Sequence, residues 1–211
     1  MRPADRNLSH YGLTAATSLF SPGVSSAAKG HHYAGPTNRF WPCVHQSGLV
    51  PEVVTYKDDA RLPHDYNIGL TNLVSRPTTA ASELSVAADM RPGVPLLLAK
   101  ILRHRPQIVC FVGKDIWREF RFVLAAAERR KTGKSVKKEQ AGWDEPRAWK
   151  VVHPQDGAGQ VQATYFWAVS STSGLCRDTV RLRLGRSCTS ARCLTRLVFA
   201  DGPAPGRLGK A

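Results

Sequence analysis

The sequence predicts an α/β domain, a three-layer α/β/α sandwich around a short parallel sheet. Two apolar runs, Ile108–Val112 and Ala163–Val169, are typical of buried strands. The segments Val94–His104 and Asp115–Arg130 instead repeat their apolar residues at helical spacing. Strands that alternate with helices in this way build a parallel sheet with helices on both of its faces.

The N-terminal part of the chain is weakly patterned. Residues 1–17 are predicted to be a weakly ordered arm before a domain that spans 18–180. The run Leu13–Phe20 has few residues to bury, whereas a central parallel strand is normally a continuous apolar run. We therefore expect the first strand to be degraded or missing before the turn at Ser21-Pro22-Gly23. The following Val24–Lys29 is small and polar, which indicates a loop or a short helical turn.

The elements in the middle of the chain follow from caps and spacing. Thr37 and Asn38 favour the start of a helix over Arg39–Gln46, which Gly48 ends. A short strand is predicted over Asn67–Leu73, and a polar loop over Ser75–Ser85. The two later helices are expected to bury their apolar faces, which consist of Leu96, Leu97, Leu98, Ile101 and Leu102 in the first and of Ile116, Phe120, Val123 and Leu124 in the second.

The C-terminal half contains two segments of unusual composition. The run Arg129–Lys138 is strongly basic and opens a flexible insert over residues 131–148. It suits a nuclear-import signal or a clamp on the DNA backbone, and it equally suits a solvated loop. Trp149–Val152 has the pattern of a strand start. Residues 181–211 have no amphipathic period, and we expect a disordered tail there.

Polar and small residues follow each predicted strand. They are Ser21, Asn72, Gly113 and Ser171. Ligands of open parallel sheets bind outside the carboxyl ends of the strands. These residues are therefore expected to converge on one edge of the sheet.

Four segments together resemble a known family. Lys29–Trp41 contains two adjacent histidines, a tyrosine and a terminal Asn-Arg-Phe-Trp run; the other segments are Asn67–Val74, Gln107–Lys114 and Ser170–Leu175. In this order they resemble the mismatch-specific uracil/thymine DNA glycosylases of the uracil-DNA glycosylase superfamily, over about Ser21 to Val180. The resemblance implies that family's fold. It also implies hydrolysis of the N-glycosidic bond of uracil or thymine in G·U or G·T mismatches, without cofactor or metal.

The resemblance also implies roles for individual residues. Tyr33 would stack on a flipped-out pyrimidine beside His32, within a pocket that includes Pro22, Gly23 and Thr78. Asn72 would read the edge of the base. The residues that would contact DNA are Lys29, Gly113, Lys114, Ser171, Ser173, Gly174 and Leu175, with Leu175 as the wedge that fills the gap in the base stack.

Position 21 departs from the family pattern. The family motif is Gly-Ile-Asn-Pro-Gly, and its asparagine positions the hydrolytic water. Here the aligned residues are Leu19, Phe20, Ser21, Pro22 and Gly23. A serine hydroxyl can bond a water, but it is shorter than an amide and lacks the amide's fixed donor and acceptor. Ser21 is thus the catalytic candidate, and we expect slow or absent turnover.

Composition is consistent with a nucleic-acid partner. The 211 residues carry 30 Lys and Arg against 16 Asp and Glu, a net charge of +14. No apolar run approaches membrane-span length, and no secretory signal is evident. The odd number of cysteines argues against a disulfide framework, and Cys176, Cys188 and Cys193 lack the paired spacing of a zinc site. We expect a nuclear monomer bound to double-stranded DNA.

Three alternatives remain open from the sequence. Ser21 and the weak first strand also suit a catalytically inactive relative that binds mismatched or abasic DNA. A misassembled gene would account for both irregular ends of the chain and would give a non-functional product. A metal-dependent nuclease is disfavoured, because the sequence has no clustered Asp and Glu constellation.

Overall fold

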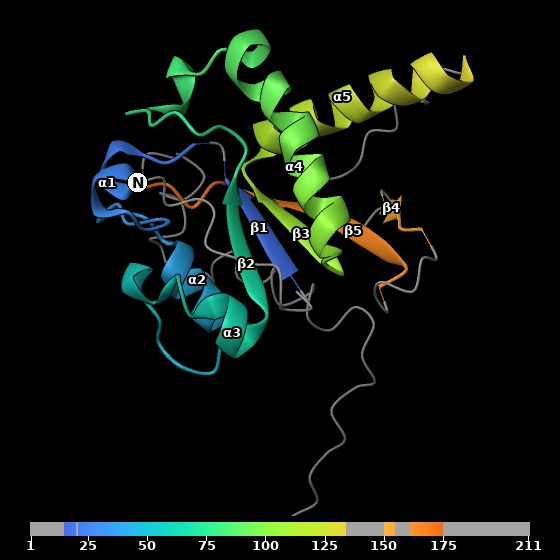
Figure 1. The fold of residues 1–211 in the computed structure, drawn as a ribbon. Coiled ribbons are helices and arrows are strands. Elements are labelled where there is room, and N and C mark those ends of the chain that lie inside the picture. The colour runs from blue at the N-terminus through green and yellow to red at the C-terminus, as the bar shows by residue number, and fades with distance from the viewer. Residues whose placement is uncertain (1–14, 20, 134–149, 155–160, 175–211) are drawn as a thin grey trace, which may run out of the picture.

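The computed structural model describes residues 15–19, 21–133, 150–154 and 161–174 (Figure 1). The strands are β1 (Ala15–Leu19), β2 (Ile68–Asn72), β3 (Ile108–Val112), β4 (Lys150–Val152) and β5 (Ala163–Val169). The α-helices are α1 (Val24–Lys29), α2 (Phe40–Gln46), α3 (Leu62–Tyr66), α4 (Arg91–His104) and α5 (Lys114–Thr132). Short 3-10 turns η1 (Tyr56–Asp58) and η2 (Ala81–Glu83) and a π-helical turn η3 (Val86–Met90) complete the described elements.

The five strands form one sheet in the order β2-β1-β3-β5-β4. The first four in this order run parallel, as predicted, and β4 adds to the edge antiparallel to β5. A parallel sheet alone was expected, so β4 is a correction. Because only the few residues 153–162 separate β4 from β5, the two strands pair antiparallel, whereas a parallel crossover needs a dozen or more residues.

The prediction of a degraded or missing first strand is wrong. β1 lies in the middle of the sheet and pairs with β2 on one side and β3 on the other, through register pairs such as Ala15 with Ile68 and with Ile108. Residues 15–17 therefore belong to the sheet and not to an N-terminal arm. The ladder is made by backbone N–H and C=O groups. A strand that is paired on both sides is thus held by backbone hydrogen bonds, and it does not need a continuous run of apolar side chains.

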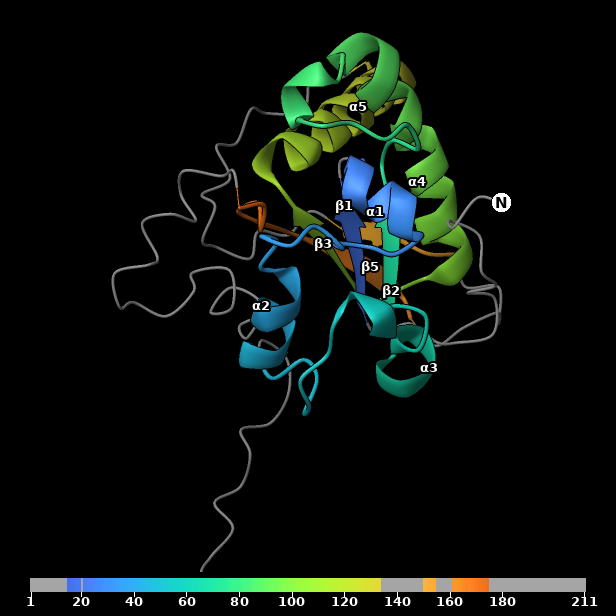
Figure 2. The ribbon, with the colours of Figure 1, turned by 90° about the vertical axis from the view of Figure 1, so that its left-hand side faces the viewer.

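Helices cover both faces of the sheet, which confirms the three-layer arrangement. Figures 1 and 2 show α4 and α5 on one side and α2 and α3 on the other. Side chains of β3 alternate between two cores: Val109 and Phe111 join the cluster under α4 and α5, and Cys110 and Val112 join the cluster on the α2 side. This alternation is what the period of two in a strand requires.

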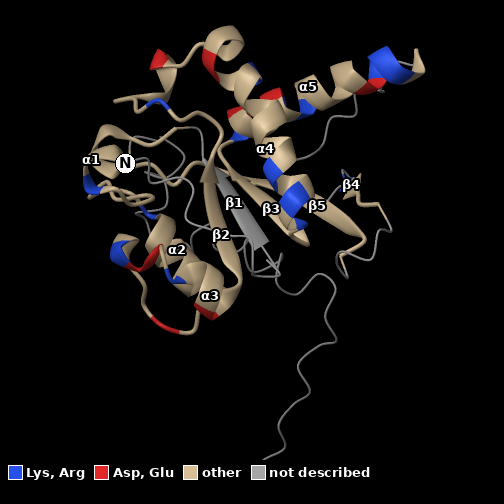
Figure 3. Cartoon of the chain, in the orientation of Figure 1, with Lys and Arg blue, Asp and Glu red and all other residues tan. Residues whose placement is uncertain are grey.

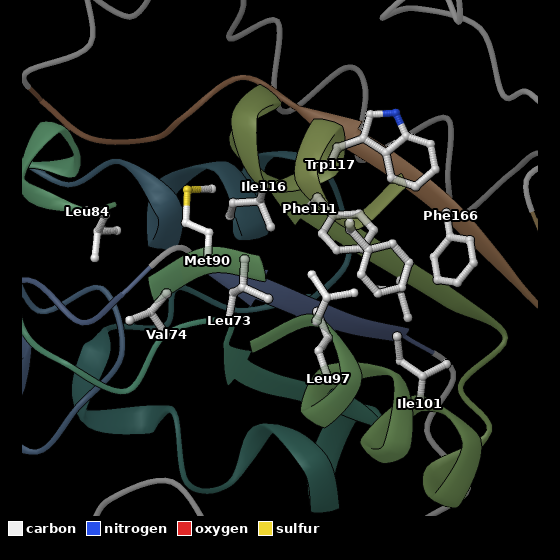
Figure 4. Close-up of a cluster of buried hydrophobic side chains, with 13 residues drawn as sticks. Leu73, Val74, Leu84, Met90, Leu97, Ile101, Phe111, Ile116, Trp117 and Phe166 are labelled. Atoms are coloured by element: carbon white, nitrogen blue, oxygen red, sulfur yellow. The ribbon is translucent and has the colours of Figure 1, made fainter. Parts of the chain in front are cut away.

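The core under α4 and α5 is rich in aromatic rings (Figure 4). The ring of Phe111 lies 5.4 Å from Trp117, 4.9 Å from Phe120 and 6.0 Å from Phe166, measured between centroids. The predicted face of α5 is confirmed: Ile116 and Phe120 are fully buried, with Val123 and Leu124 packed against the cluster.

The predicted apolar face of α4 is partly wrong. Leu97 and Ile101 are buried, but Leu96 and Leu102 are 68% and 42% exposed. Successive helical residues are about 100° apart, so adjacent leucines cannot all face the same layer. Val94 completes the buried stripe with Leu97 and Ile101 at helical spacing.

Candidate functional site

The carboxyl ends of the parallel strands meet at one edge, as predicted. Leu19 pairs with Asn72, and Val112 pairs with Val169. The predicted site residues Ser21, Gly113 and Ser171 lie one or two positions beyond these strand ends. The register therefore brings the four post-strand segments together on the same edge of the sheet.

Ser21 is bonded to Thr78. Their hydroxyl oxygens share a hydrogen bond of 2.8 Å. The Thr78 backbone N–H donates to the Pro22 carbonyl at 3.1 Å, and a parallel bridge joins Thr78 to Gly23. The predicted pocket residues of the Ser-Pro-Gly turn thus gather around Thr78, which is only 5% exposed. The hydroxyl pair commits one bond of Ser21 and leaves it a further donor or acceptor position.

Asn72 ends β2 with a buried amide oxygen. Its Oδ1 is buried and has no hydrogen-bond partner among the described residues. A buried polar atom without a partner costs about 1–3 kcal/mol. An acceptor of this kind suits an N–H donor of a ligand, such as the N3–H of a pyrimidine.

The loop between α1 and α2 is fixed by several hydrogen bonds at Ala34. The Ala34 N–H donates to Ser26 Oγ at 3.0 Å, and its carbonyl accepts from Lys29 Nζ at 3.1 Å and from Ser25 Oγ at 3.3 Å. The Lys29 ammonium also lies 4.8 Å from the centroid of the Tyr56 ring. Lys29, predicted to contact DNA, therefore has contacts within the protein, and its DNA contact stays a prediction.

Asp59 holds the part of the same loop that precedes Tyr33. Its Oδ1 lies 2.9 Å from His31 Nδ1, and its Oδ2 accepts from the His32 backbone N–H at 2.8 Å. Burial lowers the pKa of His32, and Lys100 and His31 lower it further, while Asp59 opposes them. The His32 imidazole is therefore neutral at neutral pH.

Tyr33 packs against the start of α2. Its ring stacks on Phe40 with centroids 3.6 Å apart and planes 3° from parallel, and Trp41 meets it edge-on. The residue is only 3% exposed, and its hydroxyl has no partner among the described residues. Burial, reinforced by Cys110, raises the pKa of Tyr33 well above its usual value. One ring face is thus occupied by Phe40, and a base would have to use the other.

The segment after β5 lies against the segment before α2. The Arg39 N–H donates to the Thr172 carbonyl at 3.0 Å, and Thr172 is buried. Gly174 approaches Thr37 so closely that an added Cβ would lie 2.5 Å from the Thr37 Cβ. Ser171 Oγ accepts from the Ser173 N–H at 3.3 Å. The predicted phosphate-binding serines therefore flank Thr172, which is bonded to Arg39. Arg39 directly precedes Phe40, the residue that stacks on Tyr33.

Gly113 and Lys114 begin α5 at the same edge. Gly113 has φ 131°, which a residue with a side chain rarely adopts, and its N–H donates to the Val169 carbonyl at 2.9 Å. Helix α5 begins at Lys114, and the backbone N–H groups at the start of a helix suit an anion.

Some predicted residues and segments lie outside the described residues. They are the wedge Leu175, the arm 1–14, residues 134–148 of the predicted insert, the tail 181–211 and the three cysteines after position 175. Lys131 and Thr132, which the prediction placed in the flexible insert over residues 131–148, instead end helix α5. In the part of the chain that the structure describes, Cys43 and Cys110 are buried free thiols, and no three His, Cys, Asp or Glu residues gather as a metal site. None of the described helices is long and apolar enough to cross a bilayer.

Comparison with known proteins identifies the family. The family model described as the uracil DNA glycosylase superfamily matches residues 20–186, most of the chain. The chain belongs to this superfamily.

A curated relative is also similar to the chain. It is a G/U mismatch-specific uracil DNA glycosylase of Schizosaccharomyces pombe (strain 972 / ATCC 24843), 37% identical over 115 residues. The match covers 53% of this chain and 35% of the relative. The chain thus spans about a third of the length of the relative that it matches.

Sequence analysis alone misses two residues that support this candidate site. Asp59 is one acidic residue in a polar stretch, and such a residue carries no signal of its partners His31 and His32. Thr172 lies between two serines in a polar segment, but it is buried and its carbonyl accepts from the Arg39 N–H. Only the three-dimensional pairing of distant segments shows either role.

Proposed function

We propose that this chain is a monofunctional DNA glycosylase of base excision repair that hydrolyses the N-glycosidic bond of uracil or thymine in G·U or G·T mismatches. The single observation that carries the proposal is the buried Oδ1 of Asn72, which has no hydrogen-bond partner among the described residues. Asn72 ends β2, the strand next to β1, and β1 leads to the Ser21–Thr78 hydroxyl pair. Superfamily membership and the similarity to a G/U mismatch-specific enzyme support the same reaction class.

The reaction requires a flipped nucleotide. A base inside the duplex is out of reach, and extruding it costs a few kcal/mol, least at a mismatch. In the proposed pocket, Asn72 Oδ1 accepts the pyrimidine N3–H, and the wall of His32 and Tyr33 contacts the base. Leu175 fills the gap in the stack. Ser171, Ser173, Gly174, Lys29 and the Gly113-Lys114 turn hold the backbone around it.

Hydrolysis forms one bond and breaks one. The water oxygen bonds to C1′ of the sugar, the C1′–N1 bond breaks, and its electron pair leaves on the base as an anion while the water proton passes to solvent. In the proposed mechanism Ser21 orients the water, and the free position on its hydroxyl makes that contact. The Asn72 amide N–H and nearby dipoles would stabilise the departing anion.

Ser21→Asn tests the catalytic assignment. An amide places the water more firmly than a hydroxyl does, and a misplacement of about 1 Å costs ~10²-fold in rate. We therefore expect Ser21→Asn to raise the single-turnover rate of uracil release from a G·U duplex by about 10- to 100-fold. Ser21→Ala, the matched variant without a hydroxyl, is expected to fall below wild type. Equal rates for all three would refute the role of position 21.

A catalytically inactive DNA-binding relative is the second candidate. The observation that favours it is Ser21, which replaces the family asparagine and already bonds Thr78. Such a protein would bind mismatched or abasic duplexes with an affinity that falls steeply as salt rises. Salt-dependent binding without base release, even by Ser21→Asn, would establish this alternative.

The proposed setting is a monomer that acts on double-stranded DNA in the nucleus. Lys and Arg occur on several elements, with a cluster at the end of α5 (Figure 3). This cluster opens the basic run Arg129–Lys138. Loss of nuclear fluorescence from a tagged chain after Arg129, Arg130 and Lys131 are changed to Gln would support an import signal. Unchanged localisation together with weaker DNA binding would support a backbone clamp.

A further inference from the structure

We propose that Asp59 is a positioning residue that holds the loop of His31, His32 and Tyr33 in its base-binding shape. This inference rests on the proposed glycosylase function, which assigns His32 and Tyr33 to the base pocket but gives no role to Asp59. Both oxygens of the carboxylate are used: Oδ1 meets His31 Nδ1 at 2.9 Å, and Oδ2 meets the His32 N–H at 2.8 Å. The Asp59 side chain is only 9% exposed.

The loop needs such a restraint because its backbone is unfavourable. Tyr33 has φ 54°, in the left-handed region that costs residues with a side chain about 1–2 kcal/mol. The Phe40 stack holds the ring of Tyr33 but not the backbone that leads into it. The bond from Asp59 to the N–H of His32 fixes the residue just before the left-handed position. Bonds at Ala34 fix the residue just after it.

Asp59 is itself held by a rigid corner. It follows the turn η1, in which Thr55 and Asp58 form a capping box, and its N–H donates to the Tyr56 carbonyl. Asp58 is paired with Arg61, and the next residue, Leu62, is fully buried at the start of α3. The Asp59 carboxylate therefore connects the loop of His31, His32 and Tyr33 to the η1 turn and helix α3.

Asp59→Ala and Asp59→Asn separate the effect of the loop conformation from the effect of the carboxylate charge. Alanine removes both bonds. Asparagine keeps a carbonyl for the His32 N–H, and its amide can donate to His31 Nδ1 in the other tautomer, but the negative charge is lost. Asp58→Asn is the matched control: it removes the charge of the neighbouring carboxylate, which bonds to Thr55 and Arg61, but it keeps an amide oxygen that accepts from the Thr55 N–H, so the η1 turn that holds Asp59 is retained.

Single-turnover release of uracil is measured in wild-type and Ser21→Asn backgrounds, together with duplex affinity. We expect Asp59→Ala to slow release about 10- to 100-fold with little change in affinity, since the error is in orientation. Asp59→Asn should lie between Ala and wild type, and Asp58→Asn should keep the wild-type rate. A normal rate in Asp59→Ala would overturn the proposal.

Two readouts do not depend on activity. Hydrogen exchange of the His32 amide should speed up at least about 10-fold in Asp59→Ala and stay slow in Asp58→Asn, because only Asp59 accepts that N–H. NMR titration should show the His32 pKa below its wild-type value in Asp59→Asn, since the negative charge that opposes burial, Lys100 and His31 is gone. Unchanged His32 exchange in Asp59→Ala refutes the positioning role. Absence of base release in every background instead refutes the proposed function and leaves the exchange result to decide on Asp59.

Discussion

At the scale of single residues, the site contains polar atoms that the fold buries without partners. Tyr33 Oη and Asn72 Oδ1 are both of this kind within the described residues. For Asn72 the proposed N3–H donor of a pyrimidine would supply a partner and so a reason for the cost. No such donor is assigned to the Tyr33 hydroxyl, so its cost is a loss of stability only.

Tyr33→Phe should therefore leave the free energy of unfolding equal or raise it by about 1 kcal/mol, because it removes an unsatisfied buried hydroxyl and keeps the stacked ring. Urea unfolding measures this difference. Tyr66→Phe is the control, since the Tyr66 hydroxyl donates to Glu52. A larger loss of stability at position 33 than at position 66 would show that the Tyr33 hydroxyl has a partner.

The sequence predicts residue roles where a motif contains them. Ser21 and Asn72 lie on one edge because β1 leads to the first and β2 ends at the second, and Thr78 joins them through its bridge to Gly23. Asp59 and Thr172 act through partners 27 residues or more away in the chain. Local pattern has no information about such pairs, so both were missed.

At the scale of elements, the corner of η1 and α3 depends on ion pairs around Arg61. Its guanidinium contacts Glu52, Asp58 and Asp65. The pKa of Glu52 is lowered by the Tyr66 hydroxyl and by Arg61; that of Asp58 by the Thr55 N–H and by Arg61. The pKa of Asp65 is lowered by His64 and by Arg61. Arg61 thus contributes to lowering the pKa of all three carboxyl groups.

Arg61→Gln should make thermal stability less dependent on pH in the acid range. A carboxyl whose pKa is depressed on folding binds fewer protons than in the unfolded chain, so its contribution exists above its ordinary pKa and is lost as pH falls through the folded value. The difference in Tm between wild type and Arg61→Gln should therefore be largest near neutral pH and shrink below about pH 4. A constant difference down to pH 2 would contradict this account.

Elements with a strong pattern were predicted well, and those without one were not. β3, β5 and α5 follow from continuous apolar runs and a clear helical period. β1 was wrongly predicted to be degraded or missing, because it is stabilised by backbone hydrogen bonds to β2 and β3 and not by an apolar run. On α4, three adjacent leucines do not indicate which side of the helix faces the sheet. Only Leu97 of the three is buried.

At the scale of the whole molecule, helix α4 comes close to the backbone that follows β2 at Gly93. A Cβ at this position would lie 2.2 Å from the Leu73 carbonyl oxygen, which no side-chain adjustment can relieve. Leu73 directly follows Asn72 at the end of β2. The spacing between these two layers therefore bears on the position of the amide in the proposed pocket.

Gly93→Ala should lower the free energy of unfolding by about 1–3 kcal/mol, although alanine is normally the better helix residue. For a chain of this size that corresponds to a Tm lower by roughly 2–12 °C. Gly35→Ala is the control, because the nearest atom to its added Cβ is Asn38 Cβ at 4.0 Å. Calorimetry that found equal effects at both positions would contradict the close approach.

The central place of β1 has a consequence for how the polypeptide assembles. Its neighbours in the sheet are supplied by residues 68–72 and 108–111, which leave the ribosome well after it. During synthesis β1 must wait unpaired while α1, α2 and α3 emerge, and parallel pairing over such separations is slow. A nascent chain halted before residue 108 would hold this strand with one open side. Chaperones that shield unpaired backbone should therefore associate with that intermediate and leave once β3 closes the gap.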